Sequence, residues 1–232
     1  MKLSRDKIFN DNTLNIFTDA SIKKRSNGET IGCAGALAYI GDYFIDESLD
    51  LVRETTNSNS ELKAIEKGVE LALLYRNRVD TINLFSDSKI SIYGLREWIF
   101  KWVNMSVGSD KLIKADGSPV MNQDIILKII YMILWNDLSI NLYHQNGHVS
   151  LKNDKSLLQA KETFINSNHL EDADMNLIKD ISQANYIVDM DTRYAVNNAY
   201  VSSSRKIIEP IKCFYLPFDV VKYSNLINTP LV

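Results

Sequence analysis

The sequence predicts an α/β fold in which a five-stranded mixed sheet is flanked by helices. Three strand-like segments follow one another within residues 13–50, and helical and strand-like periods then alternate up to residue 144. Meandering strands followed by crossover units are typical of a mixed sheet with helices on its faces. The length of 232 residues suits one large domain or a domain with appendages.

The first three strands are expected at residues 14–19, 32–40 and 43–50. The second strand is rich in small residues, which indicates that a helix or another backbone lies close against it. Gly41-Asp42 predicts a hairpin turn between the second and third strands. The loop between the first two strands covers residues 22–31 and contains Lys23, Lys24, Arg25, Asn27 and Gly28.

Helices are expected where apolar side chains recur at helical spacing, first over residues 61–76. Ser118-Pro119 looks like an N-cap followed by proline in the first turn, so a strongly apolar helix is expected to begin there. The remaining expected elements are a strand at 81–87, a helix from about 88 to 103 and a fifth strand at 139–144.

The chain beyond the fifth strand is expected to be mainly helical. Residues 149–184 suggest two short helices, at roughly 155–166 and 173–183, and carry a net charge of −2. The tail over residues 196–232 is expected to be irregular and packed on the domain, with a short strand at 212–216.

Composition indicates a soluble globular protein, with 45% hydrophobic and 24% charged residues. No apolar run approaches the ~20 residues that span a bilayer, and the N-terminus lacks the apolar core of a signal peptide. Cys33 and Cys213 give no disulfide framework, so an intracellular, cytoplasmic setting is expected. The net charge of −3 argues against a broadly basic nucleic-acid binder, although a few well-placed Lys or Arg suffice for phosphate contacts.

Four carboxylates lie at the boundaries of expected elements or in a late helix. Asp19 and Asp87 end two strands that can be adjacent and parallel, and ligand sites lie beyond the carboxyl ends of such strands. Glu61 opens a crossover helix, and Asp189 lies in a late helical stretch with Asp191 nearby. Converging carboxylates require neutralising cations, so a meeting of the four predicts a divalent metal site. Taken singly, each acid is equally well explained as a cap or a solvated side chain.

Short segments around these acids occur in a characteristic order. They are residues 18–21 with 32–36, 55–62, 85–88 with 95–102, 114–120 and 144–148. Together they resemble the motifs of the type 1 ribonucleases H, and Asn185 to Asp189 keeps that family's four-residue step from Asn to Asp. The resemblance covers residues 13–148 and resumes at 185–195.

The resemblance implies a ribonuclease H-like fold and an endonuclease that hydrolyses the RNA strand of RNA–DNA hybrids, leaving 5′-phosphate and 3′-hydroxyl ends. It implies two Mg²⁺ ions about 4 Å apart, with Mn²⁺ as a substitute, and Mg²⁺ prefers oxygen ligands. By analogy Asp19 bridges both ions, Glu61 and Asp87 hold one, and Asp189 holds the other. His148 assists product release or proton transfer, whereas the place of His144 inside a strand favours a structural role.

The resemblance also implies contacts with the hybrid, whose 2′-hydroxyls distinguish RNA from DNA in the minor groove. Asn57 matches a family residue that touches the hybrid there, and Thr56 matches one that helps to hold a DNA phosphate. Ser58 departs from the family's second asparagine, and Lys89 stands where the family often has a polar amide.

Two departures from the family pattern are visible. The segment over residues 101–116, where many bacterial members carry a basic handle for substrate, has a net charge of only +1. Modest, salt-sensitive hybrid affinity is therefore expected. The insertion over residues 149–184 replaces a short loop. Four roles are open for it: a lineage-specific decoration, a brace for the His148 loop, a gate that limits substrate access, or a surface that binds a protein.

We therefore expect a ribonuclease H domain over residues 1–200 that contains the 149–184 insertion, and a C-terminal extension over 201–232 that is packed on the domain or partly flexible. A monomer without a membrane partner is expected. Two rival functions stay open: a non-catalytic nucleic-acid-binding domain of the same fold, and a nuclease of the broader superfamily that acts on DNA.

Overall fold

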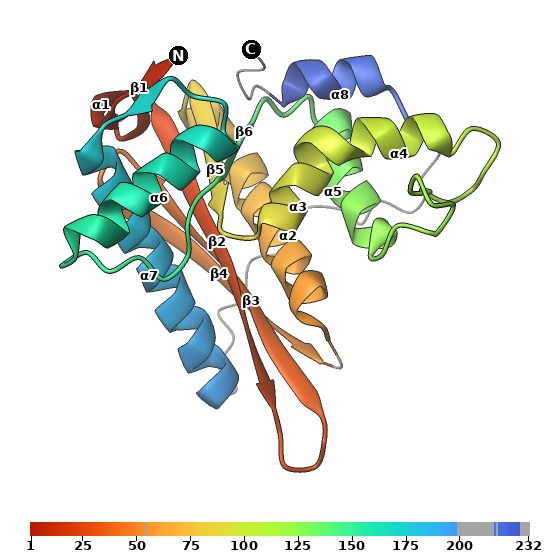
Figure 1. Ribbon diagram of the computed structural model, residues 1–232, viewed down its shortest axis with the longest axis horizontal. Coiled ribbons are helices and arrows are strands. Elements are labelled where there is room, and N and C mark those ends of the chain that lie inside the picture. The colour runs from red at the N-terminus through yellow and green to blue at the C-terminus, as the bar shows by residue number, and fades with distance from the viewer. Residues whose placement is uncertain (54, 199–215, 217, 228–232) are drawn as a thin grey trace.

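A five-stranded mixed sheet forms the centre of the computed structural model, which describes residues 1–53, 55–198, 216 and 218–227. In spatial order the strands are β4 (Tyr43–Arg53), β3 (Thr30–Ile40), β2 (Thr13–Lys24), β5 (Thr81–Ser86) and β6 (Asn141–His144). The strands β2, β3 and β4 form an antiparallel meander, and β5 and β6 run parallel to β2. The predicted mixed sheet is confirmed (Figure 1).

The strands β2 and β3 are longer than the sequence predicts. They stay paired as far as Lys24 opposite Thr30, so their hairpin projects beyond the rest of the sheet (Figure 1). Asp19 therefore lies in the middle of β2 and not at its end. The polar residues after Asp19 favour a loop in the sequence, but their backbone pairs with β3 whatever the side chains are.

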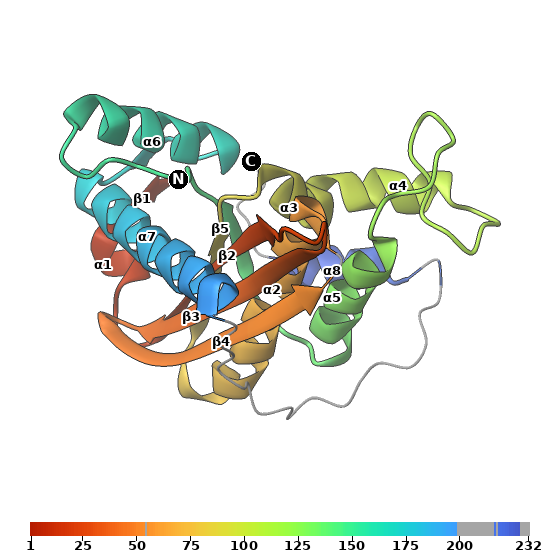
Figure 2. The same ribbon diagram turned by 90° about the horizontal axis from the view of Figure 1, so that it is seen from below.

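Alternate side chains of the strands point to opposite faces of the sheet. On one face, Ile16, Leu84 and Leu142 pack in a core with the helices α2 (Asn57–Tyr75) and α5 (Gln123–Trp135). The two helices lie on the same side of the sheet in Figure 2. This core is the largest among the described residues and fixes α2 against the strand that carries Asp19.

The opposite face is covered by α7 (Met175–Asn198) and α6 (Asp154–Ser167). Phe17, Phe85 and Tyr143 from adjacent strands stack here, with centroid separations of 4.9 and 5.2 Å. The small residues predicted to admit a close neighbour do so, because a Cβ on Gly35 would lie 2.5 Å from Thr192 Cγ2 of α7.

Two helix starts differ from the predictions. The helix α2 begins at Asn57, four residues before Glu61, because the Thr56 side chain caps it by accepting a hydrogen bond from Asn59 N. The helix α5 begins at Gln123 after Asn122, and not at Ser118-Pro119, since Pro119 forms an isolated bridge with Ile113. Glu61 consequently lies in the second turn of α2, farther from the helix end than expected.

The helix expected from about 88 to 103 is interrupted. It consists of α3 (Lys89–Tyr93), a π-helical segment η2 (Gly94–Trp98) and α4 (Ile99–Met105). The π-helical segment contains Arg96, which is buried. Its guanidinium donates to Leu142 O of β6 at 3.2 Å and to Ser167 O at 2.5 Å. An arginine in an apolar helix pattern thus joins the sheet to the end of α6.

The insertion differs from two short helices. The first expected helix is α6, but the second is the start of α7, which runs without a break past Asp189. Leu177, Ile181 and Val188 continue one apolar face with no glycine or proline to stop the helix. Between α6 and α7, the short strand β7 (Asp172–Ala173) pairs with β1 (Lys2–Leu3) at the N-terminus.

The remaining short elements are α1 (Arg5–Ile8), η1 (Arg76–Arg78) and α8 (Val220–Leu226). The tail expected to be irregular therefore contains a helix, and the Tyr223 hydroxyl of α8 donates to Leu95 O at 3.0 Å. Most of the strand expected at 212–216, together with Cys213, lies outside the described residues, and Cys33 is buried in β3. Within the part of the chain described here, every helix is too short or too polar to cross a membrane.

Candidate metal centre

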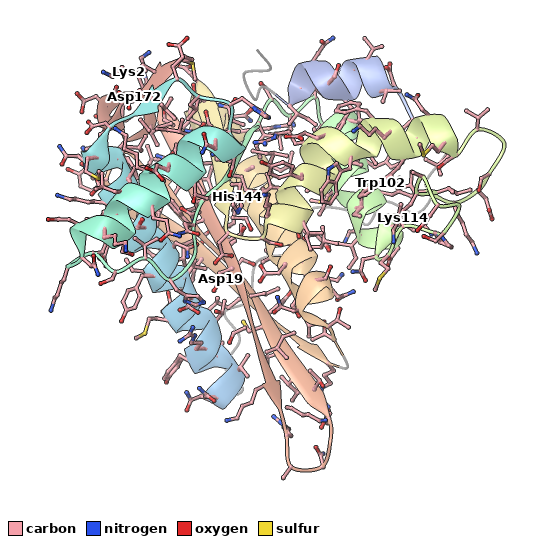
Figure 3. All side chains as sticks on the ribbon, in the orientation of Figure 1. Lys2, Asp19, Trp102, Lys114, His144 and Asp172 are labelled. Atoms are coloured by element: carbon pink, nitrogen blue, oxygen red, sulfur yellow. The ribbon has the colours of Figure 1, made fainter. Side chains whose placement is uncertain are left out.

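The register of two parallel strands brings the first two acids together. Thr18 of β2 pairs with Ser86 of β5, so Asp19 and Asp87 are the next residues on neighbouring strands. Figure 3 shows Asp19 on the sheet between α7 on one side and α2 on the other. The predicted adjacency of these two carboxylates follows from backbone pairing alone.

Glu61 joins them from the second turn of α2. A carboxylate oxygen from each of Asp19, Glu61 and Asp87 lies within 4.8 Å of one from each of the others. Asp19 and Glu61 are buried, with exposed fractions of 5% and 7%. The expected meeting of these three acids is therefore present in the structure.

Asp189 reaches the same cluster from α7. Its side chain hydrogen-bonds that of Asp19, and its charge acts on both Asp19 and Asp87. Arg193, one turn later, forms an ion pair with it, with 2.7 Å between Arg193 Nε and Asp189 Oδ1. Asp191 instead acts on Tyr39, whose pKa is raised by burial and then by that charge. The geometry thus favours Asp189 over Asp191 as the fourth acid.

The cluster is electrostatically unfavourable by itself. Burial, followed by the charges of Asp87 and Asp189, raises the pKa of Asp19 to about 8. Burial, followed by the charges of Asp19 and Asp87, raises the pKa of Glu61 to about 9. Burial is also the largest cause of the raised pKa of Asp87. These carboxylates need positive charge nearby to stay ionised together.

The donor set fits a divalent cation with a preference for oxygen. All four side chains are carboxylates, which Mg²⁺ and Mn²⁺ accept as ligands. Glu61 Oε2 is buried and has no hydrogen-bond partner among the described residues. A buried acceptor without a donor is costly, and a bound cation would satisfy it.

The loop after β6 closes one side of the site. The backbone N–H of Gln145 donates to Ser86 O at 3.0 Å, and Gly147 lies so close to Asp87 that a Cβ there would collide with its carboxylate. His148 has a φ of 53° and an exposed side chain, with 3.8 Å between His148 Nδ1 and Asp189 Oδ2. The loop therefore presents an accessible imidazole to the acids.

His144 lies outside the acidic cluster. It is buried, and its Nδ1 lies 2.9 Å from Ser167 Oγ of α6. Burial, opposed by a backbone hydrogen bond, lowers the pKa of His144 to about 4. Figure 3 shows it beside the end of α6 and away from Asp19. An imidazole held in this way joins the sheet to the insertion.

Two buried amides support Asp87, and the sequence reasoning did not single out their role. The Asn185 side chain donates a hydrogen bond to Asp87, and its Oδ1 accepts one from Gln145 Nε2 at 2.6 Å. Gln145 Oε1 is left without a partner among the described residues. The signal for Asn185 was its place one helical turn before Asp189, which puts both on one face of α7. Gln145 carried no such signal.

The residues expected to touch substrate lie at the N-terminus of α2 and the start of α3. Thr56 and Asn57 are exposed, and Ser58 Oγ lies 3.4 Å from Asn122 Nδ2, which donates to it. Lys89 is also exposed, and its Nζ lies 5.3 Å from the centroid of the Tyr93 ring.

Comparison with known proteins gives consistent matches. The family model described as RNase H matches residues 11–164. A ribonuclease H of Ruthia magnifica subsp. Calyptogena magnifica is 30% identical over 138 residues, which are 59% of this chain and 84% of that protein. A ribonuclease H of Tropheryma whipplei (strain Twist) is 39% identical over 74 residues, which are 32% of this chain and 41% of that protein.

Solved structures support the fold. The native protease-reverse transcriptase of prototype foamy virus aligns with a TM-score of 0.53 and 14% identity, covering 82% of this chain and 21% of that one. The foamy viral protease-reverse transcriptase in complex with an RNA/DNA hybrid aligns with a TM-score of 0.50 and 14% identity, covering 68% of this chain and 20% of that one. At this level of identity the likeness concerns the fold alone.

Proposed function

Because the chain belongs to the ribonuclease H family, whose model matches residues 11–164, we propose that it is an endonuclease that hydrolyses the RNA strand of RNA–DNA hybrids. The products would carry 5′-phosphate and 3′-hydroxyl ends. The observation that carries this proposal is the convergence of Asp19, Glu61 and Asp87 within 4.8 Å, with Asp189 beside them. A non-catalytic binding domain would have no need for so costly a cluster.

The four acids would hold two Mg²⁺ ions, or Mn²⁺ in their place. Asp19 would be shared by both ions, Glu61 and Asp87 would bind one, and Asp189 would bind the other. When bound, the ions supply Lewis acidity and acidify an attacking water. The chain contributes the placement of the carboxylates: two on paired strands, and one on each of two helices packed on opposite faces of the sheet.

Other side chains have supporting roles in the proposal. Arg193 offsets the charge of Asp189 and keeps its carboxylate oriented. The exposed imidazole of His148 would take up or release a proton, or assist product release, at the edge of the cluster. Asn185 holds Asp87 in place through the hydrogen bond that its amide donates.

The N-terminus of α2 would face the minor groove of the hybrid. Helix N-termini present free backbone N–H groups that suit phosphate. Thr56 and Asn57 are exposed there, and Ser58 is tied to Asn122 at the start of α5. Side chains of this kind hydrogen-bond 2′-hydroxyls, which only the RNA strand has. Lys89 would contribute a nearby positive charge.

The insertion would act as a brace in this scheme. Asn168, at the end of α6, accepts from the His144 backbone N–H at 2.9 Å and donates to His144 O at 2.7 Å. The Asn168 side chain thus provides hydrogen-bond partners for the backbone at the end of β6, the strand that leads into the His148 loop. We therefore favour a bracing role for residues 149–184 within a domain of residues 1–200.

A substrate panel tests the proposed function. The protein is incubated with labelled RNA–DNA hybrid, duplex RNA and duplex DNA, each with Mg²⁺, Mn²⁺ or chelator. We expect metal-dependent cutting of the RNA in the hybrid alone, with products that carry 5′-phosphates and 3′-hydroxyls. Cutting of duplex DNA would support the broader superfamily nuclease instead. Binding of the hybrid without cutting in either metal would support the non-catalytic alternative.

A further inference from the structure

The hairpin between β2 and β3 forms an ordered arm that the proposed chemistry does not use. We define the hairpin arm as residues 22–31. The strands stay paired to Lys24 and Thr30, and the turn is closed by a hydrogen bond from Arg25 N to Glu29 O at 2.8 Å. Gly28 has a φ of 86°, which suits the tight turn. Figure 1 shows the arm projecting beyond the helices on both faces.

Positive charge is concentrated on this arm, where Lys23, Lys24 and Arg25 outnumber Glu29 and leave a net charge of +2. Lys23, Lys24 and Arg25 are consecutive and exposed, and none of them forms an ion pair with another described residue. Arg53 of β4 lies beside the arm, paired with Glu29 at 3.8 Å. The whole chain has a net charge of −3, so this group of cations is a local exception. Exposed cations on a rigid support attract polyanions.

The arm is an extension of the strand that carries Asp19. Lys24 lies five positions after Asp19 along β2, which is about 17 Å in an extended strand. Phosphates on one strand of a duplex recur about every 3.4 Å along its axis. A duplex held at the acids would therefore present backbone phosphates at the arm about half a helical turn away. Lys23 is also tied to α7 by a hydrogen bond from its Nζ to Asn197 Oδ1 at 2.7 Å.

The segment over residues 101–116 is a weaker source of attraction. Lys101, Lys111 and Lys114 are accompanied there by Asp110 and Asp116, which leave a net charge of +1. Figure 3 shows Lys114 on the loop after α4, far from Asp19 and from the arm. The two basic segments therefore lie in different directions from the acids.

We propose that the hairpin arm binds the phosphate backbone of the RNA–DNA hybrid on one flank of the cleavage site and is the chain's main electrostatic handle. This inference rests on the proposed function for the identity of the duplex. It assigns the greater part of the salt-dependent affinity to Lys23, Lys24 and Arg25 and the smaller part to the 101–116 segment.

Two charge-matched variants test the arm. One replaces Lys23, Lys24 and Arg25 by Gln, and the other replaces Lys101, Lys111 and Lys114 by Gln. Both lower the net charge by the same amount, so a difference between them reports location. Each is made with Asp87→Asn, which keeps the hybrid intact, and binding to a labelled hybrid of about 25 base pairs is measured by anisotropy from low to moderate salt. Thermal unfolding checks that both variants fold.

Neutralising the arm should weaken binding at low salt by about tenfold or more and reduce the slope of log Kd against log salt by about 2 to 3. The 101–116 variant should change that slope by less than 1. Two hybrids, each shortened by about half a turn at one end, locate the contact. The arm variant and its parent should bind one of them equally and differ on the other.

An unchanged slope in the arm variant, or equal losses of affinity in both variants, would contradict the proposal that the arm is the main electrostatic handle. These outcomes separate from failure of the proposed function. If the hybrid binds with the expected salt dependence but the wild-type protein does not cut it, the proposed function is wrong and the proposed role of the arm stands. If the wild-type protein cuts the hybrid but the arm variant keeps the salt slope of its Asp87→Asn parent, the proposed role of the arm is wrong and the proposed function stands. Absence of hybrid binding would contradict both.

Discussion

At the residue scale, the buried acids of the candidate metal centre destabilise the fold while no cation neutralises them. Asp19 and Glu61 are buried beside other carboxylates, and burial is the largest cause of their raised pKa values. Their positions are fixed by strand pairing and helix packing, so they cannot move apart. A bound cation would neutralise these carboxylates and remove the repulsion between them.

Replacing Asp19 by Asn should therefore stabilise the protein when metal is absent. Asparagine keeps the shape and removes one buried charge, so the free energy of unfolding in chelator should rise by about 1–3 kcal/mol. Added Mg²⁺ should stabilise the wild-type protein more than the variant. Urea unfolding with and without Mg²⁺ measures both effects. A variant that is less stable than the wild-type protein in chelator would contradict this account.

Gln145 should affect metal binding without touching metal. Gln145→Leu removes the donor that orients Asn185, so Asp87 loses a firmly placed hydrogen bond. We expect the Mg²⁺ concentration at half-maximal activity, and the Mn²⁺ dissociation constant from calorimetry, to rise about tenfold. Gln183→Leu, an exposed change on α7, serves as control. Loss of stability with unaltered metal affinity would make Gln145 merely structural.

At the element scale, α2 is fixed to α5 by a buried carboxylate. Glu66 of α2 is 3% exposed and forms ion pairs with Lys63, at 3.2 Å, and with Lys128 of α5. Burial alone would raise the pKa of Glu66, but the hydrogen bond from Lys128 and the charge of Lys63 outweigh it and lower the pKa. This bridge helps to hold the helix that carries Glu61.

The bridge predicts a pH dependence. Because the pKa of Glu66 in the folded protein lies below its ordinary value of 4.5, its stabilisation is present above that pH and is lost as the pH falls further. Glu66→Gln should lower the free energy of unfolding by about 1–3 kcal/mol at pH 7. The difference from the wild-type protein should shrink below pH 4.5, as measured by urea unfolding at several pH values. A difference independent of pH would exclude this explanation.

The end of α6 should stabilise the edge of the sheet. Asn168 is fully buried, and its side chain bonds both backbone groups of His144 and the guanidinium of Arg96. Asn168→Ala leaves these groups unpaired and should cost about 2–4 kcal/mol. Asn153→Ala, which removes only the N-cap of α6, should cost about 1 kcal/mol. Equal losses in chemical unfolding would argue against the bracing role of the insertion.

At the scale of the whole molecule, the sequence was sufficient for the sheet and for most of the acidic cluster. Strand periodicity placed Asp19 and Asp87 on neighbouring parallel strands, because backbone pairing in a mixed sheet leaves few choices. Helical periodicity placed Glu61 on a crossover helix. The motifs favour Asp189 over Asp191 as the fourth acid. In the structure, Asp189 acts on Asp19 and Asp191 acts on Tyr39.

The remainder depended on contacts between segments distant in sequence. The extent of the β2–β3 hairpin cannot be predicted from side-chain polarity, because the backbone continues to pair where the side chains become polar. The true start of α2 depends on the Thr56 cap, and the unbroken α7 joins the insertion to the site. The bond from Gln145 to Asn185 links residues 40 apart, which no local pattern indicates.

The measurement that tests the central claim most directly is cleavage of an RNA-labelled hybrid by the wild-type protein and by Asp87→Asn at saturating Mg²⁺. Circular dichroism and thermal unfolding would show that both proteins are folded. We predict RNA cleavage by the wild-type protein and a loss of at least about a thousandfold in rate for the variant, since a carboxylate that holds a catalytic ion cannot be replaced by a neutral amide. Cleavage by the folded variant at the wild-type rate would contradict the assignment of this cluster as the catalytic metal centre.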